Sequence, residues 1–210
     1  MLLDNHKITS NKSGKEIGLH QAIYEYIQTK GVLSLSMNPH DALLWAHYAD
    51  GHKGITLGFN ENLLNISHTG YGEVTYHANP PYVAKFIELV DEFETFCRPW
   101  DGAEYPDERG TEFYNKQLDT MFRASFYSKS EKWKYEEEFR IISDPGNHPY
   151  HPEALEEIIL GAKTSPADEK TIKKILSHPD YSHVKLKKVF NPPGTFDFLS
   201  RELPGDVSVD

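Results

Sequence analysis

The residues best suited to chemistry lie in one segment, K-S-E-K-W-K-Y-E-E-E-F-R, at positions 129–140. If this segment is an extended strand, Glu136, Glu138 and Arg140 share one face and Glu137 points to the other. Two carboxylates and a guanidinium at this spacing change one another's proton affinities, as groups in functional sites often do. We therefore take Glu136, Glu138 and Arg140 as the candidate catalytic residues.

These three side chains have a catalytic and a structural interpretation. In the catalytic one, Glu138 stabilises a positively charged, sugar-like transition state or accepts a proton, while Glu136 tunes it and Arg140 fixes the geometry or binds an anionic group. In the structural one, they form a solvated strand face on which Arg140 neutralises its neighbours, and such exposed pairs contribute only ~0.2–1 kcal/mol each. The sequence leaves both interpretations open.

A second group of polar and aromatic residues lies nearer the front of the chain. Its members are the candidate ligand-binding residues Trp45, His47, Tyr48, His52 and Lys53. Tyr48 can stack on an aromatic ligand while its hydroxyl orients that ligand, although a core position is the common alternative. His47 and His52 are five residues apart, not the four that align two metal ligands on one helix face, so we assign no metal ligands. The alternative for His47 is a hydrogen-bonded packing group at a helix end.

Lys129, Cys97 and two aromatic residues complete the candidates. Lys129 is a further candidate ligand-binding residue that can reach a phosphate, although a lysine before a strand can also be simply solvated. Trp133 and Tyr135 are expected to be core anchors that fix the direction of the carboxylates. Cys97 has no base nearby in the sequence, which disfavours a nucleophilic role. The chain contains no phosphate-binding loop, dinucleotide fingerprint, zinc-protease pair or nucleophile elbow.

Length and composition narrow the class of protein. The 210 residues, 38% of them hydrophobic, predict one domain over 19–200, with a poorly ordered lead-in at 1–18, a mobile loop near 97–112 and a tail at 201–210. The net charge of -10 argues against broad electrostatic binding of nucleic acid or anionic membranes. The single cysteine excludes an intramolecular disulfide, and no apolar run approaches the ~20 residues that span a bilayer. We expect a cytoplasmic protein that takes a small-molecule or nucleotide ligand.

Hydrophobic periodicity and breaker residues predict interleaved helices and strands. Helices are expected at 19–29, from Asn38 or Asp41 to a stop near Gly51, at 82–96, at 113–126, and from Thr164 or Ser165 to Leu176. Strands are expected at 31–36, 55–59, 72–77, 158–161 and 183–190. The last two strands and the helix between them form a β-α-β unit, expected to be right-handed if the strands share a sheet. We predict an α+β (mixed) fold with a central sheet of short strands and flanking helices.

Two stretches together resemble a family of bacterial proteins of unknown function, domain of unknown function 2971. One is L-L-W-A-H-Y-A-D-G-H-K-G-I-T-L-G-F at 43–59, and the other is the segment 129–140, followed by I-I-L-G at 158–161. Their order and spacing match over roughly 32–189. Members of the family usually begin with a further strand-helix unit. Since that unit is absent or eroded here, we expect a fragment or a natural shortened form, and chemistry that needs the first strand is in question.

A looser, fold-level resemblance is to ADP-ribosyltransferases, in which Tyr48 and Glu138 correspond to the second and third elements of the site. The histidine of the first element has no clear match. This resemblance implies ADP-ribosyl transfer from NAD in a toxin or phage-defence setting. It implies that Glu138 stabilises the ribosyl cation, that Glu136 orients a ribose hydroxyl or the acceptor, and that Tyr48 stacks on nicotinamide.

We expect the segments 45–54 and 133–140 to line one cleft. Two other classes of function stay open for it. One is a non-catalytic module that binds a ligand or a protein. The other is a metal-assisted hydrolase, which requires His47, His52 and either Glu136 or Glu138 to converge.

Overall fold

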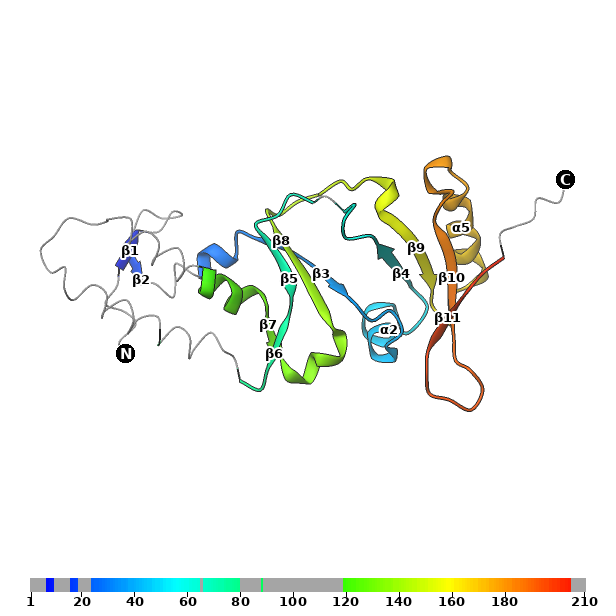
Figure 1. Ribbon diagram of the computed structural model, residues 1–210, viewed down its shortest axis with the longest axis horizontal. Coiled ribbons are helices and arrows are strands. Elements are labelled where there is room, and N and C mark those ends of the chain that lie inside the picture. The colour runs from blue at the N-terminus through cyan, green and yellow to red at the C-terminus, as the bar shows by residue number, and fades with distance from the viewer. Residues whose placement is uncertain are drawn as a thin grey trace, which may run out of the picture. The chain divides into compact units, whose positions relative to one another are not determined.

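The computed structural model describes residues 7–9, 16–18, 24–64, 66–79, 88 and 119–204 (Figure 1). The chain divides into two compact units. The first unit takes residues 1–35 and 68–146, and the second takes 36–67 and 147–210. The single domain expected over 19–200 stays a prediction.

A three-stranded sheet in the order β3-β8-β5 organises the described part of the first unit. Its strands are β3 (Gly31–Ser36), β5 (Gly70–Glu73) and β8 (Glu138–Ser143). β5 and β8 are antiparallel, with Gly70 opposite Ile142. Ile142 is fully buried, and it packs with Phe126 and Tyr127 at the end of a helix that covers 119–126. The buried half of β8 therefore holds this sheet against the helix.

The segment 70–77 changes its pairing partner half-way along. After β5, the strand β6 (Thr75–His77) pairs in parallel with β7 (Ser128–Ser130) instead of with β8. Val74 stands between β5 and β6, and its N–H donates to the carbonyl of Glu138 at 2.8 Å. The prediction of one continuous strand at 72–77 is therefore wrong, because the segment contributes to two strands. Residue periodicity carries no information about which neighbour a strand pairs with.

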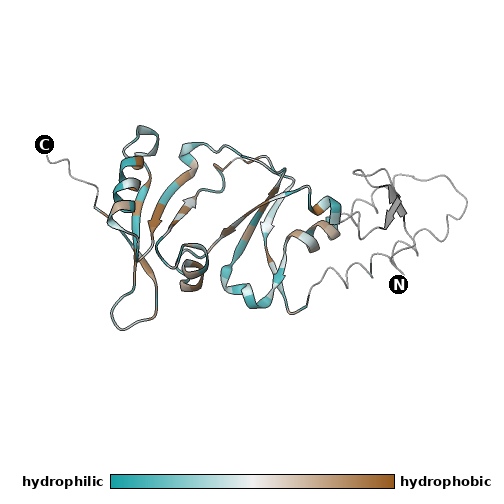
Figure 2. Cartoon of the chain, turned by 180° about the vertical axis from the view of Figure 1, so that it is seen from behind, coloured by the Kyte–Doolittle hydropathy of each residue, from teal (hydrophilic) through white to brown (hydrophobic). Residues whose placement is uncertain are grey.

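The extended conformation expected for 129–140 is also wrong in part. β7 is followed by the 3-10 helix η2 (Glu131–Glu136), and Glu137 then adopts the left-handed conformation with φ 44° before β8 begins. The sequence E-K-W-K-Y-E alternates with a period of two, yet it is also rich in helix-forming residues and places an acid at the positive end of a helix. η2 is accordingly drawn in hydrophilic colours over most of its length (Figure 2).

The second unit is built on a four-stranded mixed sheet in the order β11-β10-β9-β4. Its strands and main helix are β4 (Ile55–Phe59), β9 (Leu155–Leu160), β10 (Lys185–Phe190), β11 (Leu199–Glu202) and α5 (Pro166–Leu176). β9 and β10 are parallel with α5 between them in sequence, so the β-α-β unit is confirmed. The α+β class is confirmed as well. The short 3-10 helices η3 (Pro152–Ala154) and η4 (Pro179–Tyr181) complete this unit.

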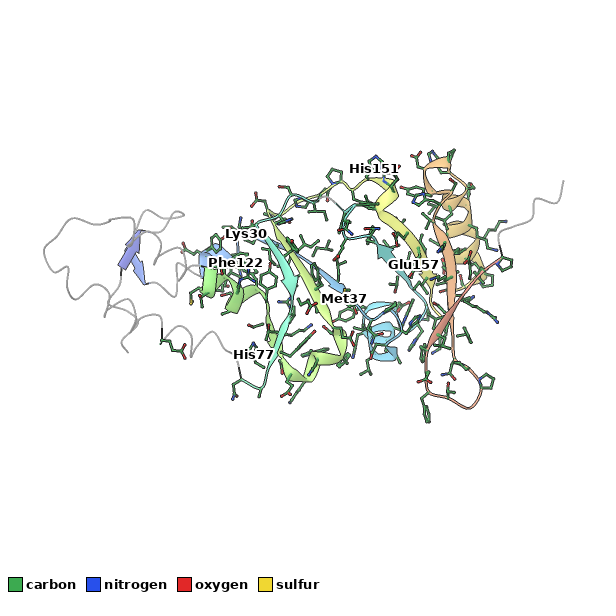
Figure 3. The ribbon with its side chains drawn as sticks, in the orientation of Figure 1. Lys30, Met37, His77, Phe122, His151 and Glu157 are labelled. Atoms are coloured by element: carbon green, nitrogen blue, oxygen red, sulfur yellow. The ribbon has the colours of Figure 1, made fainter. Side chains whose placement is uncertain are left out.

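Two lysines of the second sheet form ion pairs. Glu157 on β9, labelled in Figure 3, lies 2.5 Å from the ammonium of Lys187 on β10. Lys188 contacts Glu169 of α5 at 3.1 Å. These lysines are therefore partners in a charged network within the unit.

The helix α2 (Ala42–Tyr48) is capped by Asp41, one of the two residues between which the sequence left the cap open. The carboxylate of Asp41 accepts hydrogen bonds from the N–H groups of Leu43 and Leu44. Trp45 of α2 is 2% exposed and packs with Ile159 in the core of the second unit. The predicted start of α5 is also confirmed, since Ser165 caps that helix and Pro166 is its first residue.

Several expectations fall wholly or partly outside the described residues. The helix expected at 82–96 and the loop near 97–112 with Cys97 lie outside them, apart from residue 88, which is helical. Residues 24–27 and 119–126 are helical, within the helices expected at 19–29 and 113–126. In the lead-in expected to be loop-like, β1 (Lys7–Thr9) and β2 (Glu16–Gly18) pair antiparallel. Strands of three residues are too short to show a periodicity in the sequence.

The Asp41→Ala substitution is expected to destabilise the second unit by about 1 kcal/mol, because it leaves two N–H groups of α2 without their acceptor. Urea denaturation followed by far-ultraviolet circular dichroism measures this difference. Glu61→Ala, at an exposed position in the same unit, is the control. Equal losses in the two variants would contradict the capping role of Asp41.

Candidate functional site

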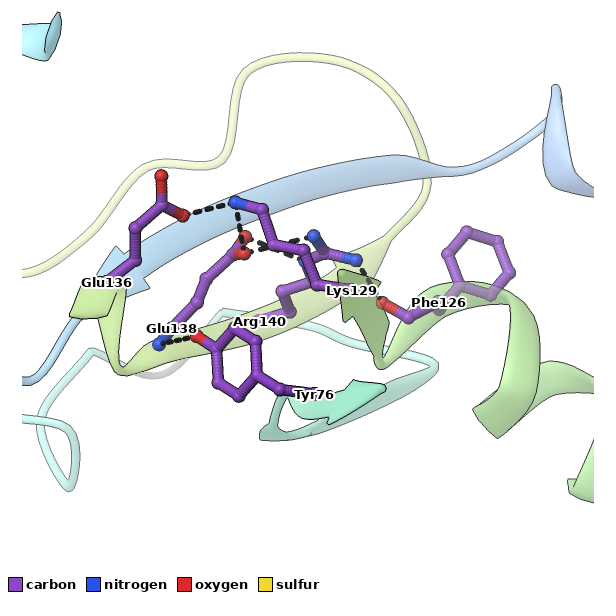
Figure 4. A network of polar contacts seen from close by, with 6 residues as sticks. All are labelled: Tyr76, Phe126, Lys129, Glu136, Glu138 and Arg140. Atoms are coloured by element: carbon purple, nitrogen blue, oxygen red, sulfur yellow. Dashed lines mark hydrogen bonds and ion pairs between the residues drawn. The ribbon is translucent and has the colours of Figure 1, made fainter. Parts of the chain in front are cut away.

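Four charged residues of the first unit form what we call the ionic cluster: Lys129, Glu136, Glu138 and Arg140 (Figure 4). Lys129 comes from β7, Glu136 ends η2, and the other two lie on β8. The cluster thus joins β7 and β8, two strands of different sheets that η2 connects in sequence. All three predicted catalytic residues belong to it, together with one predicted ligand-binding residue.

The guanidinium of Arg140 donates hydrogen bonds from two nitrogens to the carboxylate of Glu138. Nε lies 2.7 Å from Oε1, and Nη2 lies 3.0 Å from Oε2. The third nitrogen, Nη1, donates to the carbonyl oxygen of Phe126. This two-point geometry fixes the orientation of the carboxylate as well as its position. The prediction that Glu138 and Arg140 share a strand face is confirmed by these contacts.

The ammonium of Lys129 joins the two carboxylates of the cluster. Its Nζ lies 3.0 Å from Oε2 of Glu138 and also contacts the carboxylate of Glu136. Glu136 does not share the strand with Glu138, because it is the last residue of η2 and Glu137, in the left-handed conformation, separates it from β8. Lys129 therefore brings the two acids together from an element that the strand prediction did not consider.

The backbone of Glu138 is held as firmly as its side chain. Its N–H donates to the hydroxyl oxygen of Tyr76 on β6 at 2.8 Å, and its carbonyl accepts from the N–H of Val74. The change of pairing partner at Val74 is what brings Tyr76 to this position. Tyr76 was not singled out from the sequence, and its place in the strand 72–77 offered no signal, since its contact depends on that change of partner.

Both carboxylates are buried, since Glu136 is 4% and Glu138 is 6% exposed. The structural interpretation as a solvated strand face is therefore wrong for these two residues. Burial by itself would raise the pKa of Glu138, but hydrogen bonds from Arg140, Ser34 and Lys129 outweigh it and lower that pKa to about 2. Burial likewise acts to lower the pKa of Lys129, but the hydrogen bonds to Glu136 and Glu138 raise it overall.

These shifts decide which chemistry suits Glu138. A carboxylate with a pKa of about 2 stays ionised near neutral pH and is a weak proton acceptor. A fixed negative charge, by contrast, stabilises a neighbouring positive charge without any change in protonation. Of the two roles predicted for Glu138, the lowered pKa disfavours proton acceptance. The catalytic role itself stays a prediction.

An aromatic side chain borders the cluster. The ring of Trp133 lies 5.3 Å from Nζ of Lys129, in cation–π geometry, and 6.0 Å from the ring of Tyr135. Trp133 is 38% exposed, so the expectation that it is a core anchor is wrong. On a 3-10 turn it stands at the surface beside Lys129, whereas the predicted strand placed it on a buried face. The helix-forming run E-K-W-K-Y was the signal that indicated this turn.

The second predicted group lies on and after α2 in the second unit. Trp45 is a core residue whose indole N–H donates to the carbonyl of Pro39 at 2.8 Å, which corrects its assignment to ligand binding. Tyr48 is 69% exposed, so its alternative as a core tyrosine is wrong. Its ring meets that of His47 edge-on at 6.2 Å. The exposed ring of Tyr48 is compatible with ligand stacking, which stays a prediction.

His52 and Lys53 follow α2 in a turn of unusual conformation. Asp50, Gly51 and His52 all have positive φ, at 45°, 60° and 72°. The ring of His52 stacks on that of Phe198 at 5.3 Å, and its Nδ1 is buried with no hydrogen-bond partner in the described part of the chain. Lys53 is exposed and lies 3.6 Å from Asp50. Within the residues that the structure describes, no three His, Cys, Asp or Glu side chains are grouped as a metal site.

The two predicted groups of site residues belong to different units. Glu136, Glu138, Arg140 and Lys129 lie in the first unit, whereas the group around Tyr48 lies in the second. The cleft expected between 45–54 and 133–140 stays a prediction.

Comparison with known proteins confirms the predicted family resemblance over part of the chain. Residues 44–141 match the family described as protein of unknown function, DUF2971. The matched region begins in α2 and ends in β8, so it includes the ionic cluster and the group around Tyr48. No curated protein and no solved structure matches the chain. The helices in the described part are all too short or too polar to cross a membrane.

The depressed pKa of Glu138 makes the stability of the first unit depend on pH. Because the pKa is about 2 in the folded chain against 4.5 ordinarily, the stabilisation is fully present above pH 4.5 and is lost as the pH falls toward 2. Between pH 4.5 and pH 2, the free energy of unfolding of wild type is expected to fall by on the order of 3 kcal/mol more than that of Glu138→Gln. Urea unfolding at several pH values measures the difference.

Glu137→Gln is the matched control for this measurement, because it removes the same charge from the exposed residue next to Glu138. It is expected to retain the pH dependence of wild type. A Glu138→Gln variant with that same dependence would show that the ion pairs of Glu138 contribute nothing to folding.

Proposed function

We propose that the ionic cluster is the ligand site of a nucleotide-binding protein that transfers ADP-ribose from NAD. The observation that carries this proposal is the state of Glu138, a buried carboxylate that is held ionised and fixed through both its side chain and its backbone. Enzymes stabilise a developing positive charge best with such a pre-oriented negative group. The setting that goes with this activity is a toxin or phage-defence protein.

The proposed reaction breaks the glycosidic bond between the ribose and the nicotinamide nitrogen. The bonding electron pair leaves with that nitrogen, so nicotinamide departs as a neutral molecule and the positive charge passes to the ribosyl group. The acceptor then attacks the ribosyl carbon and gives up its proton to the solvent. Glu138 supplies the negative charge that faces the ribosyl cation, and Glu136 orients a ribose hydroxyl or the acceptor.

In this proposal Arg140 is a positioning residue. Its two hydrogen bonds hold the carboxylate of Glu138 in one orientation, and its third anchors the guanidinium to the carbonyl of Phe126. Lysine would be a poor replacement, because an ammonium lacks the planar fork that makes two parallel hydrogen bonds.

A non-catalytic binding module is the second candidate function. A specific observation favours it: Glu138 already contacts two cationic side chains, Arg140 and Lys129, within the chain itself. A carboxylate neutralised in this way can act purely as a structural link between β7 and β8. The ligand would then bind the same unit without being cleaved.

Glu138→Gln is expected to lower the rate of NAD cleavage by about a hundredfold or more, because the amide keeps the shape of the side chain but removes its charge. Release of nicotinamide and transfer of label from NAD are the two measurements, with water and candidate proteins as acceptors. Glu137→Gln is the control and is expected to retain the wild-type rate. Circular dichroism must show that both variants are folded.

If wild type neither hydrolyses NAD nor transfers label, the catalytic proposal fails. Equal rates for wild type and Glu138→Gln would remove Glu138 from the reaction.

Thermal denaturation separates the two candidates. As a binding module, the protein is expected to gain thermal stability from NAD or ADP-ribose while releasing no nicotinamide, because a ligand that binds only the folded state stabilises it. As an enzyme, it is expected to show both effects. No shift with any nucleotide, together with no turnover, would contradict both candidates.

A further inference from the structure

The ammonium of Lys129 sits in surroundings that are typical of a bound cation. It lies 3.0 Å from Oε2 of Glu138, contacts the carboxylate of Glu136, and stands 5.3 Å from the ring centroid of Trp133. Two carboxylates and the face of an indole are the groups with which proteins recognise organic cations. Here the chain supplies the cation itself (Figure 4).

The position of Lys129 allows its side chain to leave without a change in the fold. Its backbone is fixed, since Lys129 pairs with Tyr76 in the short ladder between β7 and β6. Its side chain is 21% exposed, whereas those of Glu136 and Glu138 are 5% and 6% exposed. A lysine stem has several rotatable bonds, so the ammonium can move to water while both carboxylates stay where they are.

Charge balance favours replacement of the Lys129 ammonium by another cation over its departure alone. The cluster holds two negative and two positive side chains, and Arg140 already makes a two-point contact with Glu138. If Lys129 leaves alone, the buried carboxylates of Glu136 and Glu138 each lose one contact with a cation, which is costly. A positively charged ligand that takes the same place restores the balance.

We propose that Lys129 is an internal competitor for a flat organic cation of the N-substituted pyridinium class, which binds between the carboxylates and Trp133 when the ammonium swings out. The inference deepens the proposed function and rests on it, because the nicotinamide ring of NAD is a cation of this class. Lys129 thus keeps the site closed until a ligand with the right charge and shape displaces it.

The exposed indole explains why this class of cation is chosen over a metal ion. Trp133 has no lone pair to offer a metal, whereas its face attracts a delocalised, weakly hydrated charge. A flat ring can also stack on the indole while its charge faces Glu136 and Glu138. After cleavage of the glycosidic bond the ring is neutral, so its attraction to the carboxylates falls.

Lys129→Ala tests the exchange directly, with 1-methylnicotinamide as the cationic probe and nicotinamide as its neutral counterpart. Titration calorimetry is expected to show that the variant binds the cation at least about tenfold more tightly than wild type does. Nicotinamide is expected to show no such gain. Lys132→Ala removes an exposed lysine from η2 and is expected to bind the cation as wild type does.

The Lys129→Ala variant is expected to be less stable, and added 1-methylnicotinamide is expected to raise its melting temperature more than that of wild type. If the variant does not fold, the inference is tested instead with Trp133→Leu, which keeps Lys129. Saturation-transfer NMR is then expected to detect 1-methylnicotinamide on wild type and to lose that signal in Trp133→Leu. A wild type without this signal would overturn the inference, as would a Trp133→Leu variant that retains it.

For a folded Lys129→Ala variant, equal affinity of variant and wild type for the cation would overturn the inference, and so would an equal gain for neutral nicotinamide. These outcomes are separate from those of the proposed function, because binding of 1-methylnicotinamide involves no turnover. If Lys129→Ala binds 1-methylnicotinamide more tightly but the protein does not cleave NAD, only the enzymatic proposal fails. NAD cleavage without exchange at Lys129 defeats only this inference.

Discussion

The two-point ion pair between Arg140 and Glu138 is the interaction on which the arrangement of the first unit depends. A carboxylate that is 6% exposed must be paired and hydrogen-bonded, or it loses its charge. Arg140 meets this requirement from the same strand, and Lys129 adds a second cation from β7. Because Glu138 is bound to both partners, its side chain links β7 to β8, two strands that belong to different sheets.

The change of partner at Val74 creates the place for this cluster. The segment 70–77 pairs first with β8 and then with β7. Between the two pairings, the N–H of Val74 donates to the carbonyl of Glu138 and the N–H of Thr75 donates to the carbonyl of Tyr127, so these backbone groups stay hydrogen-bonded. Charged side chains from both strands can therefore meet without leaving buried peptide groups unpaired. The hydroxyl of Tyr76 completes the arrangement by accepting the N–H of Glu138.

The second unit follows a different physical rule. Its β-α-β element buries a continuous apolar run on β9. Ile158 and Leu160 belong to the cluster that includes α5, whereas Ile159 packs with Trp45 in another cluster. Glu157 and Lys187 form an ion pair between neighbouring strands of this unit's sheet. Apolar packing therefore dominates this unit, whereas an ionic cluster is central to the first.

Local chemistry in the sequence determined the elements whose signals lie within a few residues. Capping residues predicted two helix starts to within a few residues, one at Asn38 or Asp41 and the other at Thr164 or Ser165. The apolar runs predicted β4, β9 and β10, because capping and periodicity depend only on near neighbours. The composition of 129–140 also located the ionic cluster. Only the tertiary structure decided that η2 interrupts this segment, that Lys129 and Tyr76 reach Glu138, and that the carboxylates are buried. Those facts depend on strand pairing between distant segments, and a one-dimensional pattern carries no information about which strands will meet.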